Sequence, residues 1–314
     1  MSSSQSLSQS LSQPSPQPSS RSALPSSVVD RLRGAGCVFA EDEAALLVAA
    51  ARTPEGLAAM VERRVAGHPL EHVLGWAEFG GLRVRVDPGV FVPRRRTEFL
   101  LGQAVALGRA VARSGRRPVA VDLCCGSGAV GAALAAALGA VELHACDIEP
   151  AAVRCARRNV AAAGGRVHEG DLFDPLPVGL RGRIDVLTAN VPYVPTEEVG
   201  LLPSEAREYE PLVALDGGAD GLHVLRRVAA EAPRWLAPGG HLLVETGERQ
   251  ADRAVAAFRR SGLLPRVAAS DELCATVVIG TRPPAVAVEP PTAAGAAGAA
   301  GAAGAAGAAG AATP

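Results

Sequence analysis

The fold of this chain is decided by the stretch Val119-Ala-Val-Asp-Leu-Cys-Cys-Gly-Ser-Gly-Ala-Val-Gly131. A short apolar run leads through a glycine-rich turn into residues that favour a helix, so the stretch predicts a strand, a turn and a helix in that order. Gly126, Gly128 and Gly131 have the spacing G-x-G-x-x-G, which alone is a weak signal of a ligand at the helix N-terminus. The surrounding sequence is therefore needed to identify the ligand.

Apolar runs of the same kind recur along the rest of the chain. Strands are predicted at residues 119–123, 141–146, 166–168, 184–189, 241–246 and 274–280, with helical spacing between most of them, for example at 149–162 and 220–235. Alternating strands and helices are typical of an α/β fold with a doubly wound, mostly parallel sheet. Ligands of such sheets bind at the carboxyl ends of the strands, where the glycine-rich turn is expected to lie.

Two carboxylates at predicted strand ends narrow the class of ligand. Asp122 would repel a pyrophosphate but favour a cation, and the sulfonium and amino groups of S-adenosylmethionine are cationic. Asp147, at the tip of the next strand, is placed to hold the two ribose hydroxyls of either kind of nucleotide. An alternative remains open, in which the glycines only permit tight packing and Asp147 caps the next helix.

The tetrapeptide Asn190-Val-Pro-Tyr193 follows the predicted strand 184–189 and resembles the N-P-P-Y signature of methyltransferases that act on planar amino or amide nitrogens. The side-chain oxygen of Asn190 and the carbonyl of Val191 can accept the two N–H bonds of an amide and aim its nitrogen at a sulfonium methyl. Pro192 stiffens the turn, and Tyr193 offers a ring face to the planar group. The alternative is an ordinary strand-to-loop turn.

From about residue 60 to 282, the chain resembles the release factor glutamine methyltransferase family. The segments that carry the resemblance are 64–75, 92–98 (Val-Pro-Arg-Arg-Arg-Thr-Glu, where the family has P-R-x-x-T-E), 122–128, Asp147, 170–172, 207–211 and 214–221. The resemblance implies the Rossmann-like fold of S-adenosylmethionine-dependent methyltransferases. It also implies methyl transfer to the glutamine amide in the G-G-Q loop of class I peptide chain release factors.

The resemblance also implies which residues form the site. The expected cofactor-binding residues are Asp122, Cys124, Cys125, Gly126, Ser127, Gly128, Asp147, Asp171, Leu172 and Asn190, and the expected catalytic residues are Asn190, Val191, Pro192 and Tyr193. Two positions depart from the family. Val191 replaces the first proline of N-P-P-Y, but it still precedes a proline, so its carbonyl should keep its direction. Cys124 replaces a glycine, which is expected to be tolerated only if φ is negative there.

Five segments are predicted along the chain. Residues 1–27 (Ser, Gln and Pro) and 285–314 (Ala and Gly) are expected to be disordered tails, because they have too little apolar surface to offset the entropy of ordering. Residues 28–73 have helical apolar spacing and form a small substrate-recognition domain, in which Thr53 caps a helix beginning at Pro54. Residues 74–92 are predicted to form a hairpin linker and 93–284 the methyltransferase domain.

Composition and targeting signals limit partners and location. Among 314 residues, 31 basic side chains nearly balance 32 acidic ones, for a net charge of −1, which excludes a strongly basic, non-specific nucleic-acid binder. A cytoplasmic monomer without a membrane partner is expected, because the N-terminus lacks the pattern of a secretory signal and no stretch is apolar enough to span a bilayer. The six cysteines form no C-x-x-C pair and the six histidines are scattered, so reduced thiols and no metal site are expected.

Three other functions are weighed against methylation of a protein glutamine. Methylation of an amino group of adenine or guanine would need a positively charged track, and Arg94-Arg95-Arg96 is too small a patch to form one. A dehydrogenase would need an acid/base constellation, and none stands out. A degenerate protein that binds S-adenosylmethionine without catalysis is suggested by the changes at Val191 and Cys124.

Overall fold

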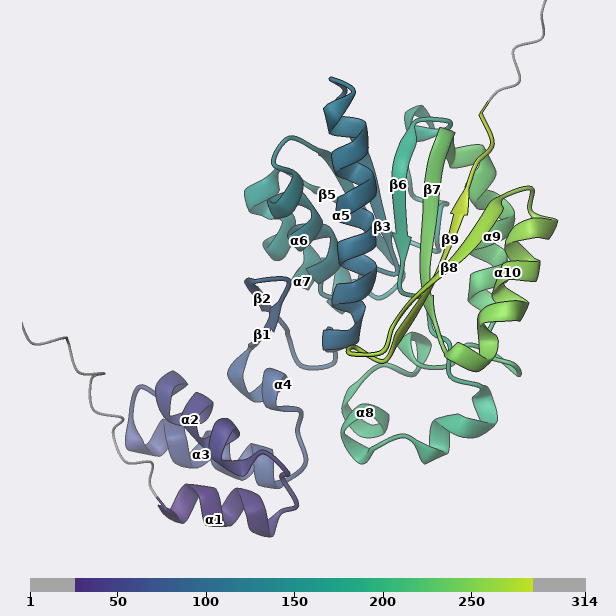
Figure 1. The fold of residues 1–314 in the computed structure, drawn as a ribbon. Coiled ribbons are helices and arrows are strands. Elements are labelled where there is room, and N and C mark those ends of the chain that lie inside the picture. The colour runs from purple at the N-terminus through teal and green to yellow at the C-terminus, as the bar shows by residue number, and fades with distance from the viewer. Residues whose placement is uncertain (1–25, 285–314) are drawn as a thin grey trace, which may run out of the picture. The chain divides into compact units, whose positions relative to one another are not determined.

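The structure, a computed structural model, describes residues 26–284, and its centre is a seven-stranded sheet in the order β5-β4-β3-β6-β7-β9-β8 (Figure 1). These strands are β3 (Val119–Leu123), β4 (Glu142–Asp147), β5 (Arg166–Glu169), β6 (Ile184–Ala189), β7 (Leu236–Thr246), β8 (Leu264–Ser270) and β9 (Ala275–Thr281). The five strands β5, β4, β3, β6 and β7 are parallel, and β9 is antiparallel to both β7 and β8. The predicted α/β fold with a mostly parallel sheet is confirmed.

The central strands agree best with the sequence pattern. Every residue of β3 and β6 is buried, as expected for parallel strands covered on both faces, and both strands have the predicted bounds. The prediction at 241–246 found only the second half of β7, because Pro238, Gly239 and Gly240 interrupt the apolar run that begins at Leu236. The edge strand β8 was not predicted, since it contains Pro265 and none of its residues is fully buried.

Helices cover both faces of the sheet, which makes it doubly wound. Figure 1 shows α5 (Glu98–Arg113), α6 (Ala129–Leu138) and α7 (Pro150–Val160) on one side and α9 (His223–Trp235) and α10 (Ala251–Arg260) on the other. Leu100 of α5 packs in one core with Leu243 of β7, while Leu225 of α9 packs in a second core with Leu242. Neighbouring residues of β7 thus point to opposite faces, as the pleat of a strand requires.

Four helices and a hairpin precede α5 and the sheet. They are α1 (Ser26–Gly34), α2 (Ala40–Ala50), α3 (Pro54–Val65), α4 (Leu70–Leu74), β1 (Trp76–Phe79) and β2 (Leu82–Arg85). The helices share a core that includes Leu32, Leu47 and Val61. Thr53 Oγ1 accepts the N–H of Gly56 at 3.1 Å, so the predicted helix cap is confirmed. Helix α1 begins two residues before the expected boundary at 28.

The two predicted tails lie outside the residues that the structure describes, apart from Ser26 and Ser27. Residues 26–283 belong to one compact unit. No helix among residues 26–284 combines the length and the apolar character that crossing a bilayer requires.

The N-terminal helices contact α8 (Ser204–Tyr209) through polar side chains. Arg64 of α3 donates to Glu43 of α2 at 2.6 Å and also to Glu205 of α8. The hydroxyl of Tyr209 donates to the carbonyl of Ala66 at 3.1 Å. These contacts matter for function because Glu205 also lines the large cavity described below.

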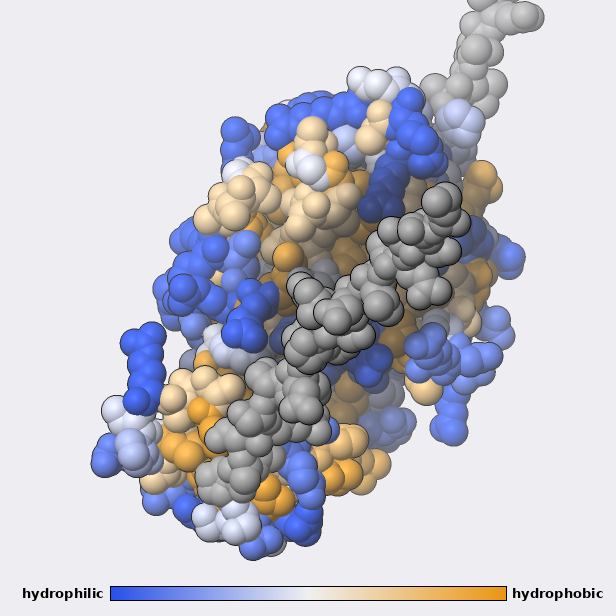
Figure 2. All heavy atoms as spheres, turned by 60° about the vertical axis from the view of Figure 1, so that its left-hand side comes forward, coloured by the Kyte–Doolittle hydropathy of each residue, from blue (hydrophilic) through white to orange (hydrophobic). Residues whose placement is uncertain are grey.

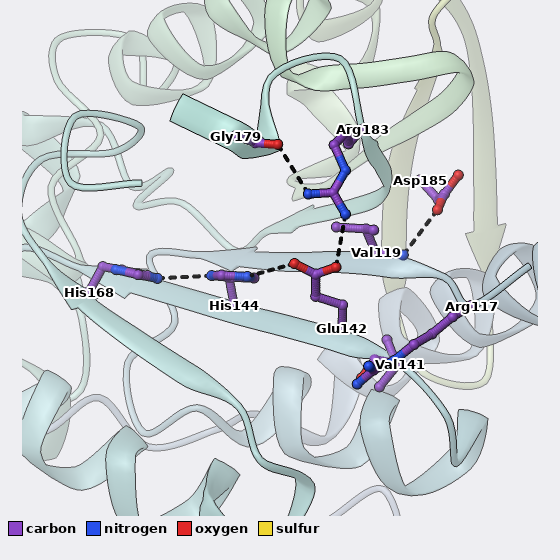
Figure 3. Close-up of polar contacts among 9 residues, drawn as sticks. All are labelled: Arg117, Val119, Val141, Glu142, His144, His168, Gly179, Arg183 and Asp185. Carbon is purple, nitrogen blue, oxygen red and sulfur yellow. Dashed lines mark hydrogen bonds and ion pairs between the residues drawn. The ribbon is translucent and has the colours of Figure 1, made fainter. Parts of the chain in front are cut away.

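A polar network lies near the amino ends of the parallel strands, away from the glycine-rich turn (Figure 3). His144 Nδ1 and His168 Nε2 lie 2.9 Å apart, and His144 Nε2 lies 3.4 Å from Glu142, which accepts from Arg183 at 3.0 Å. Burial lowers the pKa of both histidines. The fold therefore favours the neutral imidazoles.

This pair of histidines should make the fold sensitive to acid. Because their pKa values are lower in the folded than in the unfolded chain, their contribution to stability is present above about pH 6.5 and is lost as the pH falls below it. Urea unfolding from about pH 8 to about pH 5 is expected to show a smaller loss of stability in His168→Gln than in the wild type. Identical pH profiles for the two proteins would contradict the prediction.

Candidate active site

A cavity of about 500 Å³ opens at the carboxyl ends of β3, β4 and β6. Its size is that of ordinary small-ligand sites. The expected site residues that line it are Asp122, Cys124, Cys125, Gly126, Ser127, Asp147, Asp171, Leu172, Asn190, Val191, Pro192 and Tyr193. Gly128 is not part of the lining. It has φ +76°, and a Cβ there would lie 3.0 Å from the Cβ of Ala156, so this glycine permits α6 to approach α7.

Asp147 joins the glycine-rich turn to the end of β4. Its Oδ2 accepts the N–H of Gly126 at 2.8 Å and its Oδ1 accepts that of Glu149 at 2.9 Å. Helix α7 begins after Glu149, which is its N-cap residue, so the alternative role of Asp147 as the helix cap is wrong. Burial raises the pKa of Asp147, and each of its oxygens retains a lone pair for a further donor.

Asp122 lies deeper, at the end of β3. Its oxygens accept the N–H of Gly131 at 2.9 Å and the hydroxyl of Thr188 at 3.0 Å, which ties α6 to β3 and β6. Burial raises its pKa to about 7. A Cβ at position 131 would lie 3.3 Å from Asp122 Oδ2, so the third glycine of the motif leaves room for this bond.

Cys124 has an unusual backbone conformation. Its φ is +51°, so the expectation that a cysteine is tolerated here only with a negative φ is wrong, and a side chain occupies the left-handed region that favours glycine. Cys124 packs against the core that includes Leu123 and lines the cavity. Burial raises the pKa of its thiol, which disfavours the reactive thiolate. The strained residue thus lies in the lining of the cavity.

Replacing Cys124 should reveal this strain. The Cys124→Gly variant is expected to be more stable than Cys124→Ala by about 1 kcal/mol, because alanine keeps the Cβ that the left-handed conformation disfavours. Position 125 is a matched control, since the φ of Cys125 is not positive. There the alanine variant should be more stable than the glycine variant by about 0.5–1 kcal/mol. Denaturant unfolding measures both differences, and the same order of stability at both positions would exclude strain at Cys124.

Asn190 is oriented by a residue far away in the sequence. Its Nδ2 donates to Thr97 Oγ1 at 3.4 Å, and Thr97 is buried at the end of the 3₁₀ helix Arg95–Thr97. Within residues 26–284, no hydrogen bond engages Asn190 Oδ1. Thr97 thus engages the donor side of this amide and leaves the acceptor oxygen available.

The backbone behind the tetrapeptide is held by close glycine packing. Gln250 Nε2 donates to the carbonyls of Tyr193 at 2.9 Å and Asp220 at 3.1 Å. A Cβ at Gly221 would lie 2.2 Å from the Tyr193 carbonyl oxygen, and one at Gly217 would lie 2.7 Å from that of Pro192. The stretch 214–221, associated with the family by resemblance, therefore buttresses the turn.

Three arginines line the cavity, and each is paired with a carboxylate. Arg94 donates to Glu210 at 2.6 Å, Arg96 to Glu245 at 2.9 Å and Arg227 to Asp171 at 2.5 Å. The glycine-rich turn lies instead beside Asp122 and Asp147. This distribution fits a cationic ligand with vicinal hydroxyls better than a pyrophosphate. No group of three or more possible metal ligands occurs in the described part of the chain.

Sequence reasoning missed several side chains at this site. Arg96 and Thr97 were noted only as part of the segment 92–98, without a role in the site, and Glu245 and Gln250 were not noted, because the contacts of these side chains are with residues remote in the sequence. Ile148 follows Asp147, lines the cavity and is 49% exposed. A large apolar residue directly after the strand-end carboxylate was a signal that could have identified it.

Comparison with known proteins places this site in context. The sequence model of the family described as "Methyltransferase small domain" matches residues 81–201. The release factor glutamine methyltransferase of Geobacter sulfurreducens is 38% identical over 234 residues, which are 73% of this chain and 79% of that protein. A 4-amino-L-phenylalanine/4-methylamino-L-phenylalanine methyltransferase of Streptomyces pristinaespiralis is 40% identical over 205 residues, 64% of this chain and 69% of that protein.

A solved structure has a similar fold. The hMettl16 catalytic domain, in complex with a hairpin of the MAT2A 3′UTR, has a TM-score of 0.50 with 12% identity, over 70% of this chain and 81% of that one. At this identity the likeness concerns the fold alone.

Proposed function

Since the chain belongs to the release factor glutamine methyltransferase family, we propose that it transfers a methyl group from S-adenosylmethionine to a glutamine side-chain amide. The acceptor we propose is the glutamine of the G-G-Q loop of a class I peptide chain release factor, which places the protein in the cytoplasm. The observation that carries the proposal is the Asn190 side chain, whose Nδ2 is occupied by Thr97 and whose Oδ1 is left to accept a hydrogen bond at the cavity.

The tetrapeptide would orient the amide for attack. Bound S-adenosylmethionine supplies a methyl group on a positively charged sulfur, which needs no further activation. Asn190 Oδ1 and the Val191 carbonyl accept the two amide N–H bonds and oppose the delocalisation of the nitrogen lone pair. The nitrogen forms the bond to carbon, the electron pair of the breaking carbon–sulfur bond stays on sulfur, and one N–H proton passes to water.

The cofactor would be held by the residues around the glycine-rich turn. Asp147 would accept from the ribose hydroxyls with its remaining lone pairs, and Ile148 would cover the adenine, which Asp171 and Leu172 flank. The carboxylate of Asp122 would favour the positive charge of the amino acid portion. These roles follow from position in the cavity and from the polarity of each side chain.

The N-terminal helices would recognise the acceptor protein. Pro69 and Glu71 line the cavity, and Val38 and Phe39, between α1 and α2, are 85% and 68% exposed. Figure 2 shows hydrophobic side chains exposed among hydrophilic ones on one face of the protein. Exposed apolar side chains of this size favour contact with a partner protein.

A second candidate acceptor is a small aromatic amine. The Streptomyces pristinaespiralis relative is named for 4-amino-L-phenylalanine, whose planar amino group also has two N–H bonds for Asn190 and Val191 to accept. A nucleic-acid acceptor is less favoured, because the cavity arginines Arg94, Arg96 and Arg227 are paired with carboxylates and are poorly placed to follow phosphates.

Parallel assays separate the candidates. The purified protein, S-adenosylmethionine and either a purified class I release factor or 4-amino-L-phenylalanine are incubated, and methyl transfer is measured at equal acceptor concentration. We expect transfer to the release factor to be faster by at least about tenfold. Transfer to the amino acid alone would replace the proposed acceptor, and transfer to neither, with S-adenosylmethionine bound, would favour a binding protein without catalysis.

A further inference from the structure

Three side chains form a cluster where the tetrapeptide meets β7. Arg96 Nε donates to Glu245 Oε1 at 2.9 Å, and Arg96 also donates to the Tyr193 hydroxyl. The Tyr193 hydroxyl lies 3.5 Å from the same oxygen of Glu245, and the Arg96 guanidinium lies 5.4 Å from the centre of the Tyr193 ring. Glu245 is thus connected to the ring on which the methyl acceptor is proposed to pack.

Stability does not explain Glu245. Its side chain is only 3% exposed, and its Oε2 is the one buried side-chain oxygen or nitrogen among residues 26–284 without a hydrogen-bond partner. Burying a carboxylate oxygen without a donor lowers the stability of the fold. A buried carboxylate that lowers the stability of the fold and lies beside a cavity points to a role in function.

In two other buried carboxylates, both oxygens accept a hydrogen bond. Glu210 accepts from Val92 N–H at 3.1 Å and from Arg94 at 2.6 Å, each with a different oxygen. Asp185 accepts from Val119 N–H at 3.0 Å and from Arg116 at 2.6 Å, again with both oxygens (Figure 3 shows the first of these bonds). Glu245 differs, since within residues 26–284 its side-chain hydrogen bonds are made by one oxygen alone, to the two cavity residues Arg96 and Tyr193.

Arg96 needs such an anchor because its side chain is 45% exposed. An exposed arginine samples several rotamers, and fixing it requires a strong and directional bond. The charge-assisted bond to a buried carboxylate supplies one. Once fixed, Arg96 holds the Tyr193 hydroxyl and lies against the ring, so the ring cannot turn freely.

We propose that Glu245 is a positioning residue that, through Arg96, holds the Tyr193 ring in the orientation that receives the planar group of the methyl acceptor. The inference rests on the proposed function and on the expectation from the sequence that the Tyr193 ring faces the planar group of the acceptor. It adds a specificity determinant at Arg96, which occupies a variable position of the P-R-x-x-T-E motif.

Fluorine NMR tests the inference without any assay of activity. The chain has two tyrosines, Tyr193 and Tyr209, so protein labelled with fluorotyrosine should give two resonances, assigned with Tyr209→Phe. Glu245→Gln keeps the shape but removes the charge. It should shift the Tyr193 resonance and leave that of Tyr209, which contacts His68 and Ala66 instead. An unchanged Tyr193 resonance would overturn the proposal.

Kinetics supply the second readout, with whichever acceptor the wild type methylates. Glu245→Gln is expected to raise the acceptor KM by about tenfold, leave the KM of S-adenosylmethionine unchanged and cause no loss of stability. Asp185→Asn is the matched control, because it weakens a buried pair at the other end of the sheet and should leave the acceptor KM unchanged. An unchanged acceptor KM in Glu245→Gln would contradict the inference, whereas an inactive wild type would contradict the proposed function and leave the NMR result to decide the inference.

Discussion

Replacing Asn190 with alanine is expected to lower the rate of methyl transfer at least about 100-fold while leaving the affinity for S-adenosylmethionine largely unchanged. The side-chain oxygen acts on the amide nitrogen mainly as that nitrogen attacks, so its loss should appear in kcat rather than in cofactor binding. The variant removes this oriented acceptor together with the bond from Nδ2 to Thr97, which only positions the side chain. Rates under saturating cofactor, together with calorimetry, measure both effects.

Val191→Pro is the companion variant. It should be mild by comparison, because the functional atom at position 191 is a backbone carbonyl that both residues have. Val191 is 1% exposed and belongs to the core that includes Leu225, so some loss of stability is expected from the altered packing. If Val191→Pro abolished transfer and Asn190→Ala did not, the turn would be structural and the amide would have to be held elsewhere.

Asp147→Ala is expected to weaken the binding of S-adenosylmethionine by at least about tenfold, since each hydrogen bond to a charged acceptor contributes about 1.5–3 kcal/mol. The variant would remove the hydrogen bonds from the ribose hydroxyls to the carboxylate. It would also remove those from the N–H groups of Gly126 and Glu149, which shape the glycine-rich turn. Isothermal calorimetry measures the loss, and the melting temperature shows whether the variant is folded.

Asp147→Asn separates the two roles of this side chain. One amide oxygen remains to accept from a backbone N–H, so the variant should bind the cofactor with intermediate affinity. Unchanged affinity in a folded Asp147→Ala variant would remove Asp147 from the cofactor site.

The sequence was most informative where burial is complete. Strands β3 and β6 were predicted with their observed bounds, because each is a short apolar run buried on both faces. The edge strand β8 has no such apolar run. Its residues are exposed or half-buried and include Pro265, so the strand was missed. The start of β7 was missed because Gly239 and Gly240 obscure a strand whose pairing with β6 shifts register at that point.

The site was predictable only as far as its residues lie together in the sequence. Asp147 and the tetrapeptide beginning at Asn190 were found from short motifs at strand ends, and the structure places them around one cavity. Thr97 was noted only as part of the segment 92–98 and Glu245 was not noted, since no local pattern predicts a contact with Asn190 or with Arg96. These contacts arise from packing α5 and β7 beside β6.

Backbone strain was the other limit of the sequence. Cys124 was expected to be tolerated only with a negative φ, because a Cβ disfavours the left-handed region, yet the turn holds it at +51°. Such a conformation persists when the surrounding contacts determine it, and here Cys125 N–H is bonded to the Cys146 carbonyl at 3.0 Å. At Cys124 the tertiary structure therefore overrides the preference of a residue with a Cβ for negative φ.

Fragment-ion mass spectrometry of a class I release factor, after incubation with this protein and S-adenosylmethionine, tests the central claim most directly. We expect one added methyl group on the side-chain nitrogen of the glutamine in the G-G-Q loop, absent when Asn190→Ala replaces the wild type. A methyl group on another residue of the release factor, or the same yield with Asn190→Ala, would contradict the claim.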